Sequence, residues 1–68
     1  MKSMLSERLK EKREKAGLTQ DAISKTLKIS QSTYAGYETG KSQPDIVTLS
    51  KIADILETSL DYLVGRYK

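Results

Sequence analysis

The segment 20–39, QDAISKTLKISQSTYAGYET, constrains the fold of this chain more than any other part of the sequence. Its apolar and small residues follow helical spacing on both sides of a break at Lys28. Each side therefore buries one face of a short helix, and the two helices pack at a steep angle across a sharp turn. The residues on the two buried faces are Ile23, Ser24, Leu27, Ile29, Tyr34 and Tyr37.

The second helix of this unit begins with three polar side chains, Gln31, Ser32 and Thr33. Amide and hydroxyl groups of this size can meet base edges in the major groove of duplex DNA when they stand at the start of a helix. The sequence therefore favours a helix-turn-helix that binds DNA.

The composition of the chain argues against catalytic and metal-binding chemistry. Sixty-eight residues suffice for one small domain, and we expect residues 1–68 to form it. The chain has no Cys and no His, so it lacks thiolate chemistry, zinc–cysteine sites and the usual general base. Its acidic and lysine side chains are explained as helix caps or surface pairs. We expect no enzymatic activity, no cofactor, no metal and no small-molecule ligand.

Charge and hydropathy bear on the partners. No apolar run approaches the roughly 18–20 residues of a membrane span, and the N-terminus lacks an apolar signal core. We therefore expect a cytoplasmic protein with no membrane partner. The formal net charge of +3 favours an anionic partner. Charges on the first helix alternate in sign, as on a solvated face, whereas Lys28 and Lys41 stand alone beside turns and suit phosphate contacts.

Periodicity and capping signals predict an all-α fold of five helices around one core. The expected helices cover residues 3–16, 20–27, 31–39, 46–56 and 60–64. On the first of them we expect Leu5, Leu9 and Ala16 to face inward. The residues that mark helix starts are Thr19, Ser30, Asp45 and Ser59, and those that mark helix ends are Gly17, Gly40 and Gly65.

Four blocks of the sequence together resemble the phage-repressor/Cro-type (XRE) family of helix-turn-helix proteins. The blocks are GLTQ at 17–20, ISQSTYAGYETGKSQPD at 29–45, TLSKIAD at 48–54 and SLDYLVG at 59–65. This resemblance implies a compact five-helix domain that binds operator duplex DNA, usually as a symmetric homodimer, and regulates transcription. It also implies a bacterial or phage-encoded protein that is associated with the nucleoid when bound.

The resemblance assigns base contacts to Gln31 and Ser32, and Thr33 is a third candidate for a base or phosphate contact. Gln20 matches the position whose amide bonds a phosphate and braces the recognition helix. Exposed donors beside the turns complete the predicted phosphate contacts, although each can instead be an ordinary surface residue. The full predicted phosphate set is Gln20, Lys28, Thr39, Lys41, Ser42 and Gln43.

The resemblance also implies a structural ion pair. Arg13 and Glu38 match a pair that ties the first helix of the family to its recognition helix. Such a semi-buried pair fixes orientation while its net contribution to stability is small. The alternative is two independent surface charges. Tyr34 and Tyr37 match apolar positions, so we expect both to pack in the core.

Three residues depart from the family pattern. Lys28 stands where the turn usually has Gly, at a position that tends to require a positive φ, which costs about 1 kcal/mol. Ala22 replaces the acidic residue that completes a capping box with Thr19. Gly36 is expected on the outward side of the recognition helix, where relatives often carry a base-contacting side chain. We therefore expect base readout to be confined to the first turn of that helix, and binding to be modestly specific.

One domain of this size covers too few base pairs for tight specific binding, so we expect a twofold dimer on an inverted repeat. Apolar residues in the C-terminal part exceed what the inner face of the last helices can obviously bury. The predicted dimer interface is Ile55, Leu60, Tyr62, Val64 and Tyr67. The alternative is that these residues complete a small core.

Repression is the favoured mode of regulation, because so small a domain has little spare surface for recruiting polymerase. Asp21 is the one candidate for an activating contact. An antitoxin or other partner-dependent regulatory module that uses the same fold is the open alternative, although the sequence has no acidic or disordered tail for wrapping a partner. RNA binding is poorly supported, since no exposed aromatic platform is evident.

Overall fold

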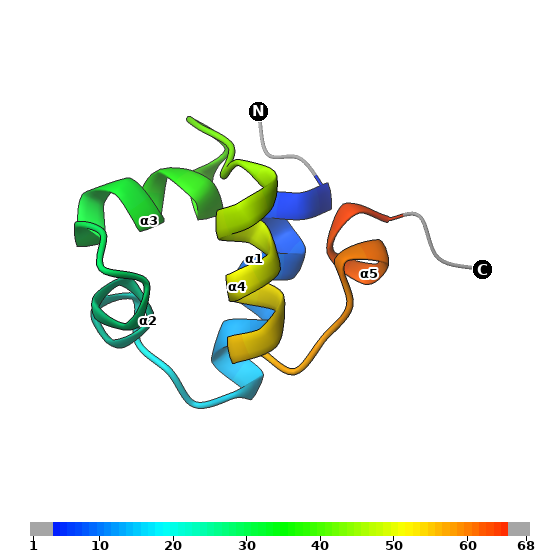
Figure 1. Cartoon of the computed structure of the whole chain (residues 1–68), viewed down its shortest axis with the longest axis horizontal. Coiled ribbons are helices and arrows are strands. Elements are labelled where there is room, and N and C mark those ends of the chain that lie inside the picture. The colour runs from blue at the N-terminus through cyan, green and yellow to red at the C-terminus, as the bar shows by residue number, and fades with distance from the viewer. Residues whose placement is uncertain (1–3, 66–68) are drawn as a thin grey trace.

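The computed structural model describes residues 4–65 and contains five helices and no strand within that range (Figure 1). The all-α, five-helix prediction is confirmed. Three helices have the predicted bounds, while the first and fourth each end one residue earlier; residue 3, the predicted first helical position, lies outside the described residues. The helices are α1 (Met4–Lys15), α2 (Gln20–Leu27), α3 (Gln31–Thr39), α4 (Ile46–Ile55) and α5 (Leu60–Val64).

Side-chain caps explain why α2 to α5 begin where they do. In each case an oxygen of the residue before the helix accepts a hydrogen bond from the backbone N–H three residues later. The donor–acceptor distances run from 2.8 Å at Asp45 to 3.1 Å at Ser30. The hydrogen bonds from Thr48 also lower the pKa of Asp45. The four capping residues are those predicted: Thr19, Ser30, Asp45 and Ser59.

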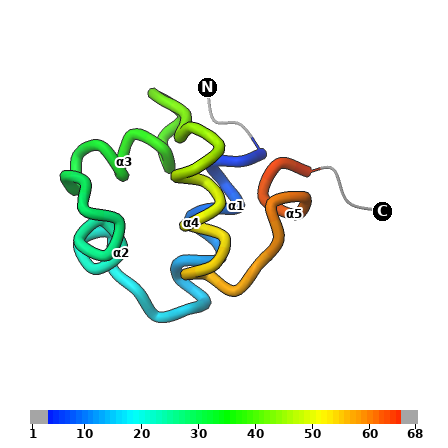
Figure 2. The backbone as a smooth tube through the Cα atoms, viewed as in Figure 1, coloured from blue at the N-terminus to red at the C-terminus, as the bar shows by residue number. Residues whose placement is uncertain are grey.

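One apolar cluster joins all five helices. Leu9 of α1, Tyr34 of α3 and Ile52 of α4 are fully buried in it. α3 packs against α1 and α2, and α4 packs against α2 and α5, which lie on opposite sides of it (Figure 2). The other buried apolar members are Ile23, Leu49, Ala53, Leu56 and Leu63.

Two expectations about burial are wrong. Ala16 is exposed, because α1 ends at Lys15 and the chain turns away through Gly17, whose φ is +74°. Apolar residues of the C-terminal part were expected to exceed the core, but three of them are half-buried and pack against it. These three are Ile55, Leu60 and Tyr62.

Tyr62 fastens the short helix α5 to α1. Its hydroxyl donates to the Glu11 carboxylate at 2.6 Å, and this hydrogen bond lowers the pKa of Glu11. Arg8 donates to the Tyr62 carbonyl at 2.5 Å, and its guanidinium carbon lies 4.3 Å from the centre of the Tyr62 ring. The Lys12 ammonium lies 4.9 Å from the same ring centre. The hydroxyl, the carbonyl and the ring of Tyr62 therefore all contact α1 of the same chain.

Candidate nucleic-acid interface

The turn between α2 and α3 sets the position of the predicted recognition helix. Lys28 adopts the left-handed conformation, with φ 62° and ψ 41°, at the position where the sequence predicted a positive φ. Its N–H bonds the Lys25 carbonyl at 3.1 Å, and the N–H of Ile29 bonds the Ser24 carbonyl at 3.0 Å. These two bonds form a Schellman ending, which places Ser30 directly at the start of α3.

A bidentate ion pair holds the inner side of α3. Nε of Arg13 donates to Oε2 of Glu38 at 2.6 Å, and Nη2 donates to Oε1 at 3.1 Å. The two side chains are only 10% and 3% exposed. The remaining guanidinium nitrogen, Nη1, donates to the Leu18 carbonyl at 2.8 Å. A single side chain therefore connects α1, the loop after it and α3.

Gln20 adds the first turn of α2 to this network. Its Nε2 donates to Oε1 of Glu38 at 3.1 Å, which is the bracing role that the sequence predicted for this residue. Burial by itself would raise the pKa of Glu38, but the pKa is lowered, chiefly because Arg13 and Gln20 donate hydrogen bonds to the carboxylate. The hydrogen bond to Glu38 also raises the pKa of Arg13. Both groups are charged at neutral pH, and the only acidic side chain of α3 points away from its outer surface.

The two tyrosines of α3 lie on the same inner side as Glu38. Tyr34 is fully buried, and this burial raises the pKa of its hydroxyl. Tyr37 is half-buried and packs against the core, with its ring edge-on to that of Tyr34 at a centroid distance of 6.0 Å. Core packing of both rings agrees with the sequence, and neither ring forms an exposed stacking platform.

The three predicted base-contacting residues are all exposed at the start of α3. Ser30 has one hydroxyl hydrogen, which it donates to Oγ1 of Thr33 at 2.7 Å. Ser32 is therefore the donor in its own 3.3 Å contact with Ser30. This leaves the Ser32 oxygen as an acceptor toward the outside and the Thr33 hydroxyl hydrogen as a donor. Gln31 is exposed, and within the described part of the chain its side chain makes no hydrogen bond, so both groups of its amide are available to a partner.

Four of the predicted phosphate contacts flank α3 as exposed side chains: Lys28 before the helix, and Lys41, Ser42 and Gln43 after it. Thr39 was also predicted to offer its hydroxyl as a donor to a phosphate, but this hydroxyl is not free. Its hydroxyl already donates to the Gly36 carbonyl at 3.3 Å, one turn earlier in the same helix.

Gly36 lies on the outward side of α3, but the prediction that it is open to the outside there is wrong, because it is buried. The chain after α3 folds back over it, so that the Ser42 N–H donates to the Gly36 carbonyl at 3.2 Å. A Cβ atom at position 36 would lie 2.9 Å from Oγ of Ser42. Glycine therefore fits here without displacing the Ser42 hydroxyl, where the loop crosses the helix at close range.

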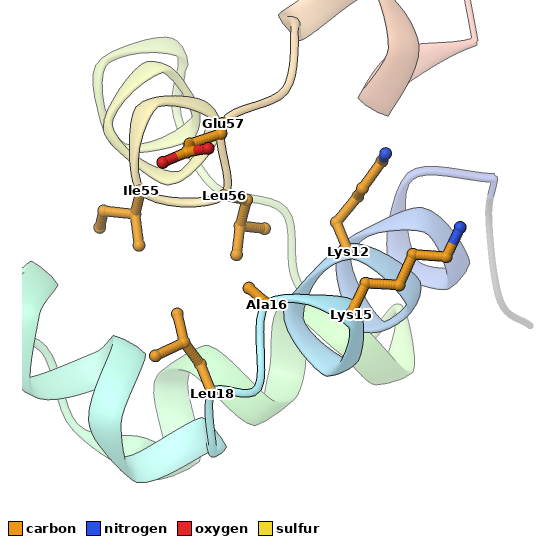
Figure 3. A pocket seen from close by; sticks show the side chains of 7 residues that line it. All are labelled: Lys12, Lys15, Ala16, Leu18, Ile55, Leu56 and Glu57. Atoms are coloured by element: carbon orange, nitrogen blue, oxygen red, sulfur yellow. The ribbon is translucent and has the colours of Figure 1, made fainter.

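A hollow of about 470 Å³ lies away from α3, between the end of α1 and the end of α4 (Figure 3). Leu18, Ile55 and Leu56 face one another across it, while the ammonium groups of Lys12 and Lys15 extend outward. Ile55, predicted as a dimer contact, thus lines a recess on this surface. The other lining residues are Ala16 and Glu57.

Residues 4–65 contain no cluster of three or more potential metal ligands. The same range holds no helix with the length and apolar character needed to cross a membrane.

Sequence comparison agrees with this geometry. Residues 9–63 match the model of a helix-turn-helix family. A steeply packed helix pair, with polar groups at the start of its second helix, defines the same class of protein. The chain belongs to the phage-repressor/Cro-type (XRE) family of helix-turn-helix proteins.

Three relatives of this chain are named as transcriptional regulators. The chain is 44% identical over 61 residues to YqaE of Bacillus subtilis, an uncharacterized HTH-type transcriptional regulator, with 90% of this chain and 53% of that protein covered. It is 40% identical over 62 residues to the HTH-type transcriptional regulator ImmR of Bacillus subtilis, with 91% and 49% covered. It is 40% identical over 63 residues to the cryptic phage CTXphi transcriptional repressor RstR of Vibrio cholerae, with 93% and 56% covered. The chain spans about half the length of these relatives.

The charge on Glu38 makes stability depend on pH. Because its pKa is lowered by folding, the stabilisation is present above the usual value of 4.5 and is lost as the pH falls through the folded value. In Glu38→Gln the Arg13 guanidinium stays buried without an anion, so we expect the free energy of unfolding at pH 7 to fall by about 3 kcal/mol. Urea unfolding at pH 7 and pH 3 measures both effects. The exposed substitution Glu14→Gln is the control, and an equal acid-induced loss in Glu38→Gln and the parent protein would contradict the assignment.

Proposed function

We propose that this protein regulates transcription by binding operator duplex DNA with α3 in the major groove. The observation that carries the proposal is the exposed polar first turn of α3, on a helix whose inner side is fixed by the Arg13–Glu38 pair. A reading helix must be held rigidly, because bidentate contacts to bases tolerate little misplacement. The names of the relatives as transcriptional regulators support the same function.

The donors and acceptors of the first turn suit particular base edges. The free Gln31 amide can pair with N6 and N7 of adenine. The Ser32 oxygen, as an acceptor, suits the amino group of adenine or cytosine. The Thr33 hydroxyl, as a donor, suits an N7, O6 or O4 acceptor or a phosphate oxygen. These three residues carry the proposed direct readout.

Backbone contacts on both sides of α3 position the domain without reading sequence. Lys28 precedes the helix and Lys41 follows it, so the two ammonium groups can reach phosphates on either side of the groove. Ser42 and Gln43 add exposed polar groups beside Lys41. The Gln20 amide donates one hydrogen to Glu38 and keeps a second for a phosphate at the start of α2.

We also propose that the protein acts as a homodimer on an inverted repeat, and that it represses transcription in the cytoplasm of a bacterial cell. One α3 helix reads only a few base pairs, so two copies at a fixed spacing are needed for tight specific binding. The relative RstR, named as a transcriptional repressor, supports repression.

The surface proposed for dimerisation is the start of α4. Ile46 and Val47 are 65% and 60% exposed and follow directly after the loop that carries Lys41. A twofold contact there would set two α3 helices at a fixed separation. It differs from the surface predicted from the sequence, three of whose five residues are half-buried against the chain's own core. Of the others, Val64 is 39% exposed and Tyr67 lies outside the described residues.

Selection of binding sites from a random duplex library tests the function. With purified protein at about 150 mM salt, where nonspecific phosphate contacts are weakened, we expect an inverted repeat whose half-sites lie about one helical turn apart. A single recovered half-site would overturn the dimer. Sequence-blind binding, or no binding, would contradict the proposed function itself.

Two substitutions separate base reading from backbone contact. Gln31→Ala should weaken binding to the selected site by about 1–3 kcal/mol and relax the preference at one base pair. Lys41→Ala should weaken binding evenly across sequences and reduce the salt dependence of log K by about one. Titrations on the selected site and on random DNA at several salt concentrations measure both effects. Equal losses on both kinds of DNA for Gln31→Ala would show that it does not read a base.

A further inference from the structure

The outward side of α3 carries a hollow, and none of the DNA contacts proposed above occupies it. It measures about 330 Å³ and lies between α3 and the loop that follows. Three and four residue steps along a helix return to the same face, so the lining residues of α3 form one stripe. Tyr34 and Glu38 lie on the opposite, buried side. The residues around the hollow are Ser32, Ala35, Gly36, Thr39 and Lys41.

The walls of this hollow are mostly apolar, because two of its polar groups are hydrogen-bonded within the chain. Gly36 has no side chain, and its carbonyl accepts hydrogen bonds from the Thr39 hydroxyl and from the Ser42 N–H. Ala35 contributes only a methyl group. Lys41, at the edge of the hollow, is its one charged lining residue. The hollow is therefore suited to an apolar group that is attached to an anionic polymer.

We propose that this hollow is the subsite for the 5-methyl group of a thymine in the major groove. The inference rests on the proposed function, since it places α3 in that groove. The thymine methyl is the apolar group that base pairs present there. The hollow shares Ser32 with the proposed base-reading turn, so a base seated in it would be a near neighbour of the bases read by hydrogen bonds. Lys41 would contact a phosphate at the edge of the same site.

The consequence is a base preference that needs no hydrogen bond from the protein. Cytosine lacks the methyl group, so a pyrimidine at this position would be distinguished by apolar contact alone. Burying one such carbon corresponds to about a fourfold change in the dissociation constant. Readout then extends beyond the first turn of α3, in contrast to the expectation from the sequence.

Deoxyuridine substitution tests this without altering the protein. Each thymine of the selected operator is replaced in turn by deoxyuridine, which removes only the 5-methyl group. We expect a rise of about fourfold in the dissociation constant at one thymine of each half-site, with smaller changes elsewhere. Replacing that thymine by 5-methylcytosine should retain more affinity than replacing it by cytosine.

A filled hollow provides the matching protein variant. Ala35→Leu places a larger apolar side chain at the hollow, on a residue type that favours helix. We expect this variant to lose its response to deoxyuridine at the sensitive position. Ala16→Leu makes the same change at an exposed position outside α3 and should keep the response of the parent protein.

The outcomes distinguish this inference from the function on which it rests. If an operator is selected but no thymine responds to loss of its methyl group, the subsite is wrong and the proposed function stands. If Ala35→Leu keeps the full response, a different part of the protein contacts the methyl group and the assignment is overturned. If no preferred sequence is selected, both the proposed function and this inference are overturned.

Discussion

The bidentate pair between Arg13 and Glu38 is the interaction on which the rest of the structure depends. It lies at the junction of α1, α2 and α3, and the amide of Gln20 completes it. Two charges removed from water in this way add little net stability, but the planar fork of the guanidinium permits few orientations of its partner. The pair therefore fixes how α3 sits on the domain. The orientation of α3 in turn sets the direction of the polar side chains in its first turn.

Local signals in the sequence were sufficient for the helices and for much of the candidate site. A capping residue acts within three residues of itself, so Thr19, Ser30, Asp45 and Ser59 located four helix starts directly. The left-handed Lys28 was predicted from the family resemblance, because the turn of the family usually has Gly at this position. The Arg13–Glu38 pair came from the family resemblance, since no local rule joins residues 25 positions apart.

What the sequence could not predict depends on contacts between distant segments. Gly36 is outward by helical periodicity, but the returning loop covers it, and nothing in α3 itself specifies the path of that loop. Tyr62 looked like surplus apolar surface because its partners Arg8 and Glu11 lie 54 and 51 positions away in the sequence, in α1. The hollow beside Ala35 follows from the same loop, which forms one of its walls. In these three cases, tertiary packing determines which groups are exposed on the surface and which are covered.

The most direct measurement is operator affinity in a variant that keeps the fold but removes the pair. In Arg13→Met/Glu38→Leu, apolar side chains of similar size replace both charges, and the free energy of unfolding should stay within about 1 kcal/mol of the parent protein. If the pair orients α3, the dissociation constant for the operator should rise about tenfold or more, the loss expected for one displaced base contact. An unchanged dissociation constant in a variant of unchanged stability would contradict the account, because α3 would then be positioned by apolar packing alone.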